Sequence, residues 1–110
     1  MEVTTRSQGD VTIVAIAGSL DSITSPQAQQ ALDAVVAHGA RKVAVDFSTL
    51  EYVSSAGLRV LLGLAKQLKA KGGALRTFGL NQTVREVFEI SGFATILSVF
   101  PGEGEALSGF

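Results

Sequence analysis

Cysteine and tryptophan are absent from this 110-residue chain, and histidine occurs once. Without cysteine the protein can form no disulfide and no thiolate metal site, and it carries no cysteine nucleophile. With His38 as the single imidazole, a transition-metal site is not expected, and a hydrolase triad would have to recruit its base from a distant helix. We therefore expect no catalytic residue, no metal and no cofactor.

Charge of one sign and long apolar runs are also missing. Nine basic and ten acidic residues give a net charge of −1, which leaves no electrostatic footprint for nucleic acid or an anionic membrane. The apolar runs are only a few residues long, whereas a membrane-spanning helix needs roughly 20. The first residues lack a basic segment followed by an apolar one, so we expect no secretion signal, no membrane insertion and a cytoplasmic protein.

Phosphate-binding and nucleophile motifs are absent as well. The sequence contains no Gly-x-x-x-x-Gly-Lys-Ser/Thr loop, no Gly-x-Gly-x-x-Gly and no Gly-x-Ser-x-Gly elbow. Direct nucleotide binding therefore has little support, and we expect a protein that is not an enzyme.

The chain is rich in core-forming residues. Hydrophobic residues make up 46% of it and charged residues 17%, which is typical of a globular protein rather than a disordered segment. A chain of this length can build one modest core but not two, so residues 1–110 are expected to form a single domain.

Hydrophobic periodicity predicts alternating strands and helices. Strands are expected at residues 2–7, 11–17, 43–47, 74–78 and 94–100, and helices at 26–38, from the serine pair at 54–55 to about 71, from 82 or 84 to 91, and at 103–108. Asn81 or Thr83 is expected to cap the third helix, and Thr83 with Glu86 has the capping-box spacing. The order indicates an α/β fold: a mixed sheet of four to five strands packed against three to four helices, with parallel strand–helix–strand units and an antiparallel opening pair.

The segment Lys42–Leu68 places two hydroxyls at the start of its helix. Ser54 and Ser55 stand where backbone N–H groups lack partners and the helix dipole favours negative charge. The small residues Ala56 and Gly57 follow and leave the hydroxyls accessible. We expect the function of the protein to reside here.

The helix after the serine pair has two faces. The face expected to lie on the sheet consists of Leu58, Leu61, Leu62, Ala65 and Leu68, and the opposite, partly charged face of Arg59, Gly63, Lys66 and Ala70. Val60 and Leu64 lie at the margin, and two interpretations stay open. They form the edge of the core, or Val60 joins Arg59 and Gly63 in a partner-binding surface beside Ser55.

Other polar residues have structural interpretations. Asp46 ends a strand and is expected to hold a turn through side-chain to backbone hydrogen bonds. His38 lies at a helix end, where the dipole favours a cation, and Ser25 is expected to cap the first helix.

Several motifs together resemble the STAS domains of bacterial anti-sigma factor antagonists. They are Gly18–Asp21, Val45–Phe47 followed by Leu50, the segment Tyr52–Leu58, Gly72-Gly73 and Val84–Phe93. They cover nearly the whole chain in the order and spacing of that family. The resemblance implies a STAS-like fold for residues 1–110.

The resemblance also implies a mechanism. Such antagonists are switched by phosphorylation of a serine at the N-terminus of the helix after the third strand. A partner anti-sigma factor with serine kinase activity adds the phosphate, and a serine phosphatase removes it; the unphosphorylated antagonist sequesters the kinase. By position the phosphorylated serine is Ser55. Many members have an aspartate directly before it, where this chain has Ser54, so Ser54 is a second candidate.

The resemblance places the partner surface around this serine. The expected contact residues are Asp21, Ser54, Ser55, Ala56, Gly57, Arg59, Val60 and Gly63. A monomer or weak dimer is expected. The alternative is a STAS subunit that regulates a membrane transporter, for example in lipid transport, without phosphorylation; co-purification with a permease or ATPase would favour it over the kinase-switched antagonist.

Overall fold

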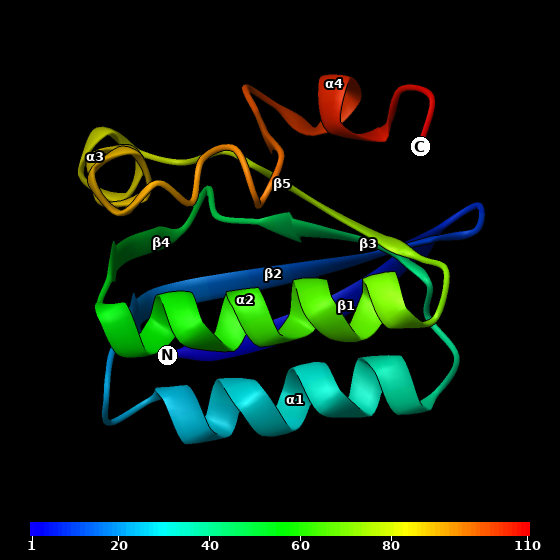
Figure 1. Ribbon diagram of the computed structural model, residues 1–110, viewed down its shortest axis with the longest axis horizontal. Helices are drawn as coiled ribbons and strands as arrows, with labels where there is room; N and C mark the ends of the chain where they lie inside the picture. Colours follow the sequence, from blue (N-terminus) through cyan, green and yellow to red (C-terminus); the bar gives the residue numbers. More distant parts are fainter.

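The computed structural model describes residues 1–110, which form six strands and four helices (Figure 1). The strands and helices follow the alternating and helical apolar patterns of the sequence. In chain order these are β1 (Glu2–Gln8), β2 (Val11–Leu20), α1 (Ser25–Ala37), β3 (Lys42–Asp46), β4 (Leu50–Val53), α2 (Ser55–Ala70), β5 (Ala74–Phe78), α3 (Gln82–Ser91), β6 (Val99–Phe100) and α4 (Glu103–Leu107). The predicted α/β plan is confirmed, including the antiparallel opening pair and the short last helix.

The sheet has six strands, where the sequence predicted four or five. Its order is β1-β2-β3-β5-β6, and β4 pairs with the far end of β2, beyond the point where β3 stops. Only β1 is antiparallel to its neighbour. The sequence signals β4 only by three apolar residues after a polar break, which is too short a pattern to identify a strand. All parallel strands direct their carboxyl ends to one edge of the sheet.

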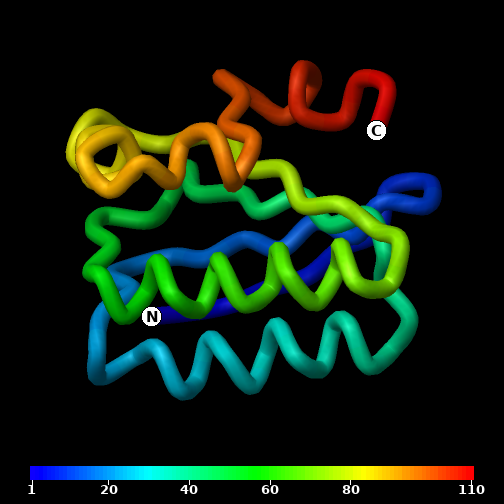
Figure 2. The backbone as a smooth tube through the Cα atoms, viewed as in Figure 1, coloured from blue at the N-terminus to red at the C-terminus, as the bar shows by residue number.

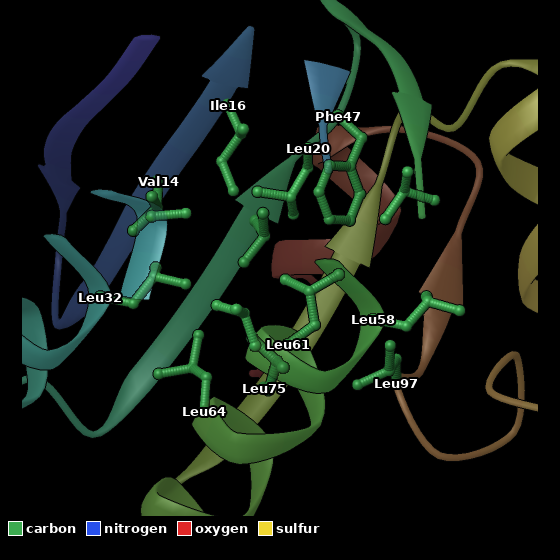
Figure 3. Close-up of a cluster of buried hydrophobic side chains, with 14 of the residues drawn as sticks. Val14, Ile16, Leu20, Leu32, Phe47, Leu58, Leu61, Leu64, Leu75 and Leu97 are labelled. Carbon is green, nitrogen blue, oxygen red and sulfur yellow. The ribbon is translucent and has the colours of Figure 1, made fainter. Parts of the chain in front are cut away.

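Both faces of the sheet are covered. Val14 and Ile16 of β2 face α1 and α2, where they meet Leu32 and Leu61 in the main core of 20 buried residues (Figure 3). A smaller cluster on the opposite face places Ile13 beneath α4. In Figure 1, α1 and α2 lie side by side on one face, α4 lies on the other side, and α3 packs beside β4. The sheet is therefore fixed from both sides.

One predicted cap, Ser25, differs from the structure, and for α3 the Asn81 alternative is confirmed. Ser25 is the first residue of α1 rather than its cap, because the Asp21 carboxylate holds the preceding turn and the Ser25 hydroxyl donates to the Asp21 carbonyl. At α3 the cap is Asn81, whose Oδ1 accepts from the Val84 N–H at 2.8 Å. The capping box at Thr83 does not form.

The strand predicted at residues 94–100 is reduced to Val99 and Phe100. The preceding residues, 92–98, form turns that lead from the end of α3 toward β5 (orange segment, Figure 2). Leu97 is fully buried in the main core, and Ser98 adopts a left-handed φ of 49°. Because Leu97 is buried in the main core, this segment cannot run along β5 as a longer strand.

Candidate functional site

The serine pair lies at the carboxyl edge of the parallel strands, where the loop between β2 and α1, the start of α2 and the helix α3 lie at one end of the molecule (Figure 2). The Ser54 N–H donates to the Leu20 carbonyl at 2.9 Å, which ties the start of α2 to the end of β2. Loops at this edge of an α/β sheet commonly carry function because the strands position them rigidly.

The two serines have different environments. Ser54 is the N-cap of α2 and half-buried, and its Oγ accepts from the Gly57 N–H at 3.4 Å. Ser55 is the first helical residue; its side chain is exposed and makes no hydrogen bond within the protein. Only the Ser55 hydroxyl is therefore free to react without breaking an existing contact.

Gly57 lets α2 approach the sheet closely. A Cβ at this position would lie 2.8 Å from Leu20 Cγ and the Leu20 carbonyl oxygen, and 2.9 Å from Val53 Cγ2. Because real Cβ atoms do not approach so closely, a side chain here would push the serine pair away from β2 and β4. Gly57 is buried, so its place in the expected contact set is structural: it positions Ser55 rather than touching a partner.

The two interpretations of the α2 margin are now resolved. Val60 is 6% exposed and Leu64 1%, and both belong to the main core. The core-edge interpretation is confirmed, and Val60 presents no side chain to a partner. Arg59 is exposed, and Gly63 is half-buried with open space around it. Conversely, Leu62 and Ala65, expected on the sheet, are only half-buried.

Asp21 holds the loop beside the serine pair. Its Oδ1 accepts from the Ile23 N–H at 2.9 Å and the Thr24 N–H at 3.0 Å. These hydrogen bonds stabilise the carboxylate and lower the pKa of Asp21 below its ordinary value of 3.8, and the bond from Thr24 has the larger effect. Asp46 plays the predicted structural part, because its Oδ1 accepts from the Ser48 N–H at 2.8 Å.

Exposed apolar side chains accompany the polar site, and the sequence analysis did not identify them. Ile23, on the loop that Asp21 holds, is 86% exposed, and Tyr52 on β4 is 45% exposed. Tyr52 pairs with Ser19, and Ile23 follows the end of the same strand. The available signal was an isoleucine inside the polar loop sequence Asp-Ser-Ile-Thr-Ser. Exposed apolar groups at one edge are typical of a protein-binding surface.

No catalytic constellation surrounds Ser55. His38 lies beyond the other end of α1, and its Nδ1 is 2.7 Å from the Ala34 carbonyl oxygen. Thirteen residues of α1 separate it from the loop at Asp21, about 20 Å along the helix axis. No group of three or more metal-ligating side chains occurs anywhere in the structure. The geometry offers an accessible hydroxyl on a helix N-terminus.

Comparison with known proteins identifies the family. The model of the STAS domain family matches residues 2–106. This chain belongs to the STAS domain family. The STAS domain is 44% identical over 101 residues to the Bordetella bronchiseptica protein named anti-sigma factor antagonist BtrV, covering 92% of this chain and 84% of that protein.

Two solved structures share the fold of this STAS domain. An anti-sigma factor antagonist from Mycobacterium paratuberculosis superimposes with a TM-score of 0.90 at 24% identity, covering 97% of this chain and 91% of that one. The Bacillus cell fate determinant SpoIIAA in its phosphorylated form superimposes with a TM-score of 0.70 at 22% identity, covering 94% of each chain. The resemblance stated from the motifs is thus confirmed at the level of family and fold.

A membrane-spanning helix needs about 20 apolar residues. No helix of this STAS domain satisfies that requirement in both length and hydropathy.

Proposed function

We propose that this STAS domain is a non-catalytic anti-sigma factor antagonist. It binds an anti-sigma factor with serine kinase activity through the edge that carries Ser55, and phosphorylation of Ser55 ends the interaction. The names of its relatives support the class of partner. The single observation that carries the choice of residue is the exposed, unbonded Ser55 hydroxyl on the first turn of α2.

The helix N-terminus lets the domain tolerate the phosphate. A phosphoserine carries about −1.5 to −2 charges at neutral pH and three strong acceptor oxygens. The first turn of α2 contains no acidic residue, so the free N–H groups and the positive dipole end meet the new charge without repulsion. The fold therefore has no reason to open.

For a partner bound at the same edge, the phosphate would weaken binding. The apolar side chains of Ile23 and Tyr52 favour an interface that excludes water. Burying an unpaired dianion in such an interface costs several kcal/mol, and each 1.4 kcal/mol weakens binding about tenfold. Phosphorylation of Ser55 would thus release a micromolar partner.

Ser54 supports the switch rather than carrying it. Its Oγ already caps α2, and phosphorylation there would have to displace the bond from the Gly57 N–H. Arg59, one turn after Ser55, is exposed and contributes a cation to the same surface. We include Asp21, Ala56 and Gly63 as surrounding surface.

Phosphate mapping tests this proposal. The protein is incubated with its kinase-type anti-sigma factor and ATP, and the phosphate is located by mass spectrometry. We expect Ser55→Ala to abolish incorporation and Ser54→Ala, the matched control, to retain it. Equal incorporation in Ser55→Ala, with the phosphate elsewhere, would overturn the assignment. A serine phosphatase should restore binding of the kinase to the phosphorylated wild type.

A further inference from the structure

A groove lies at the other end of α2 from Ser55. It has a volume of about 530 Å³ and lies between α2, the start of β5 and the turns before β6. Its apolar lining comes from Leu62 and Ala65 of α2, Leu75 of β5, and Ile96, which is 52% exposed. We call it the β5 groove. Eleven residues of helix separate Ser55 from Lys66 on its wall, roughly 16 Å.

One wall of the β5 groove is an unpaired strand edge. In a parallel ladder, alternate residues direct their backbone groups to opposite neighbours. The Ala74 N–H donates to the Arg41 carbonyl on the β3 side, whereas the Thr77 N–H donates to the Ser98 carbonyl on the other side. Leu75, two residues before Thr77, shares its orientation. Because β6 pairs only with the last two residues of β5, the Leu75 backbone groups meet no strand.

The chain itself keeps this edge open. Leu97 is fully buried in the main core, and Ser98 has a φ of 49°, a left-handed conformation that non-glycine residues rarely adopt. Together they turn the chain away from β5 before it can extend the pairing toward Leu75. Proteins usually cover or charge such an edge because it can accept another strand.

The opposite wall carries positive charge. Lys66 and Lys69 lie three residues apart on α2, both exposed and both lining the β5 groove. Neither has an acidic partner, since the two ion pairs of the protein are Arg6–Glu103 and Lys42–Asp10. A strand edge, an apolar floor and two unpaired cations together are complementary to an acidic, extended chain.

We propose that the β5 groove binds an extended acidic segment of a partner protein, which adds to the sheet as a strand beside β5. Main-chain hydrogen bonds to Leu75 supply the register. Because side chains alternate along a strand, one set packs on Leu62 and Leu75 while acidic side chains reach Lys66 and Lys69. This site is distinct from the Ser55 edge and independent of the function proposed for that edge.

The test uses the folded protein, labelled with ¹⁵N, and a synthetic octapeptide of alternating valine and glutamate. NMR titration should shift the amides of Leu75 and of residues 62–69, and the peptide should slow hydrogen exchange at the Leu75 amide. A valine–lysine octapeptide and a backbone N-methylated valine–glutamate octapeptide are the matched probes. Both should bind at least tenfold more weakly, the first by repulsion and the second because it cannot pair as a strand.

Protein variants locate the site. Lys66→Glu with Lys69→Glu should weaken the binding of the acidic peptide at least tenfold, whereas Arg85→Glu, a single charge reversal on α3, should leave the peptide affinity unchanged. Equal binding of the acidic and basic peptides, absence of binding, or an unprotected Leu75 amide would overturn the proposal. Protection of Leu75 without peptide that increases with protein concentration would overturn it too, by showing that a second copy occupies the edge.

Discussion

At the scale of single residues, the site depends on how closely α2 approaches the sheet. Gly57→Ala places a Cβ 2.8 Å from Leu20 atoms, one of them backbone, and such overpacking costs about 1–3 kcal/mol. Gly63→Ala is the matched control on the same helix, because nothing lies within 4 Å of its added Cβ. There the helix propensity of alanine should stabilise the protein by up to ~1 kcal/mol. Urea unfolding measures both, and equal effects of the two substitutions would contradict this account.

The carboxylate of Asp21 makes its contribution to stability dependent on pH. Its pKa is lower in the folded protein than its ordinary value of 3.8, because the Thr24 and Ile23 N–H groups donate to it. The stabilisation is therefore present above pH 3.8 and is lost as the pH falls through the folded pKa. Wild type should be more stable than Asp21→Asn at pH 6, and the difference should shrink below pH 3.8. Thermal unfolding across that range measures it; a constant difference would contradict the assignment.

At the scale of elements, α4 depends on one arginine. Arg76 Nη1 of β5 donates to the Ala106 carbonyl at 3.0 Å and the Ser108 carbonyl at 2.9 Å, and its guanidinium lies 4.4 Å from the centre of the Phe110 ring. Arg76→Ala should loosen α4 and destabilise the protein by about 1–3 kcal/mol.

Two measurements check this role of Arg76. Hydrogen exchange in residues 103–110 should accelerate in Arg76→Ala more than exchange in α1, which packs on the other face of the sheet. Arg76→Lys should lie between wild type and alanine, because lysine keeps the cation but loses the planar fork. Uniform acceleration over both elements would show that α4 is not specifically held by this side chain.

The same scale explains what the sequence could predict. β5 occupies the predicted residues 74–78, because this short segment with the apolar residues Leu75 and Phe78 is bounded by glycines on both sides. β4 escaped prediction because its partner is the end of β2, and a four-residue strand has no period of its own to detect. Ser25 does not cap α1, because it is the first helical residue and the Asp21 carboxylate accepts from the Thr24 N–H in the turn before the helix.

For the candidate site, the sequence predicted the position but not the environment of each side chain. The sequence located the serine pair at the start of α2, and the structure confirms the location. The distinction between a bonded Ser54 and a free Ser55 depends on which residue begins the helix, and periodicity does not determine helix ends to one residue. Ile23 was missed for a different reason, since only the folded loop shows that its side chain is outside the core.

At the scale of the whole molecule, the proposed switch requires that charge at Ser55 act on partners and not on the fold. Ser55→Asp places a carboxylate at the N-terminus of a 16-residue helix, where the dipole favours it by about 0.3–1 kcal/mol. The free energy of unfolding should therefore be unchanged or slightly raised, whereas binding of the anti-sigma factor should fall at least tenfold. Urea unfolding and calorimetric titration measure the two quantities on the same protein.

Two further variants separate the two surfaces of α2. Ser55→Asn has the size of the aspartate without its charge and should retain most of the binding. Lys66→Glu with Lys69→Glu changes the far end of the same helix and should leave the Ser55 edge intact, because exposed charges roughly 16 Å apart are screened beyond a Debye length of about 8 Å at physiological salt. If Ser55→Asp unfolded the protein, the switch would act through the fold. If Ser55→Asn lost binding equally, side-chain size rather than charge at the interface would account for the loss.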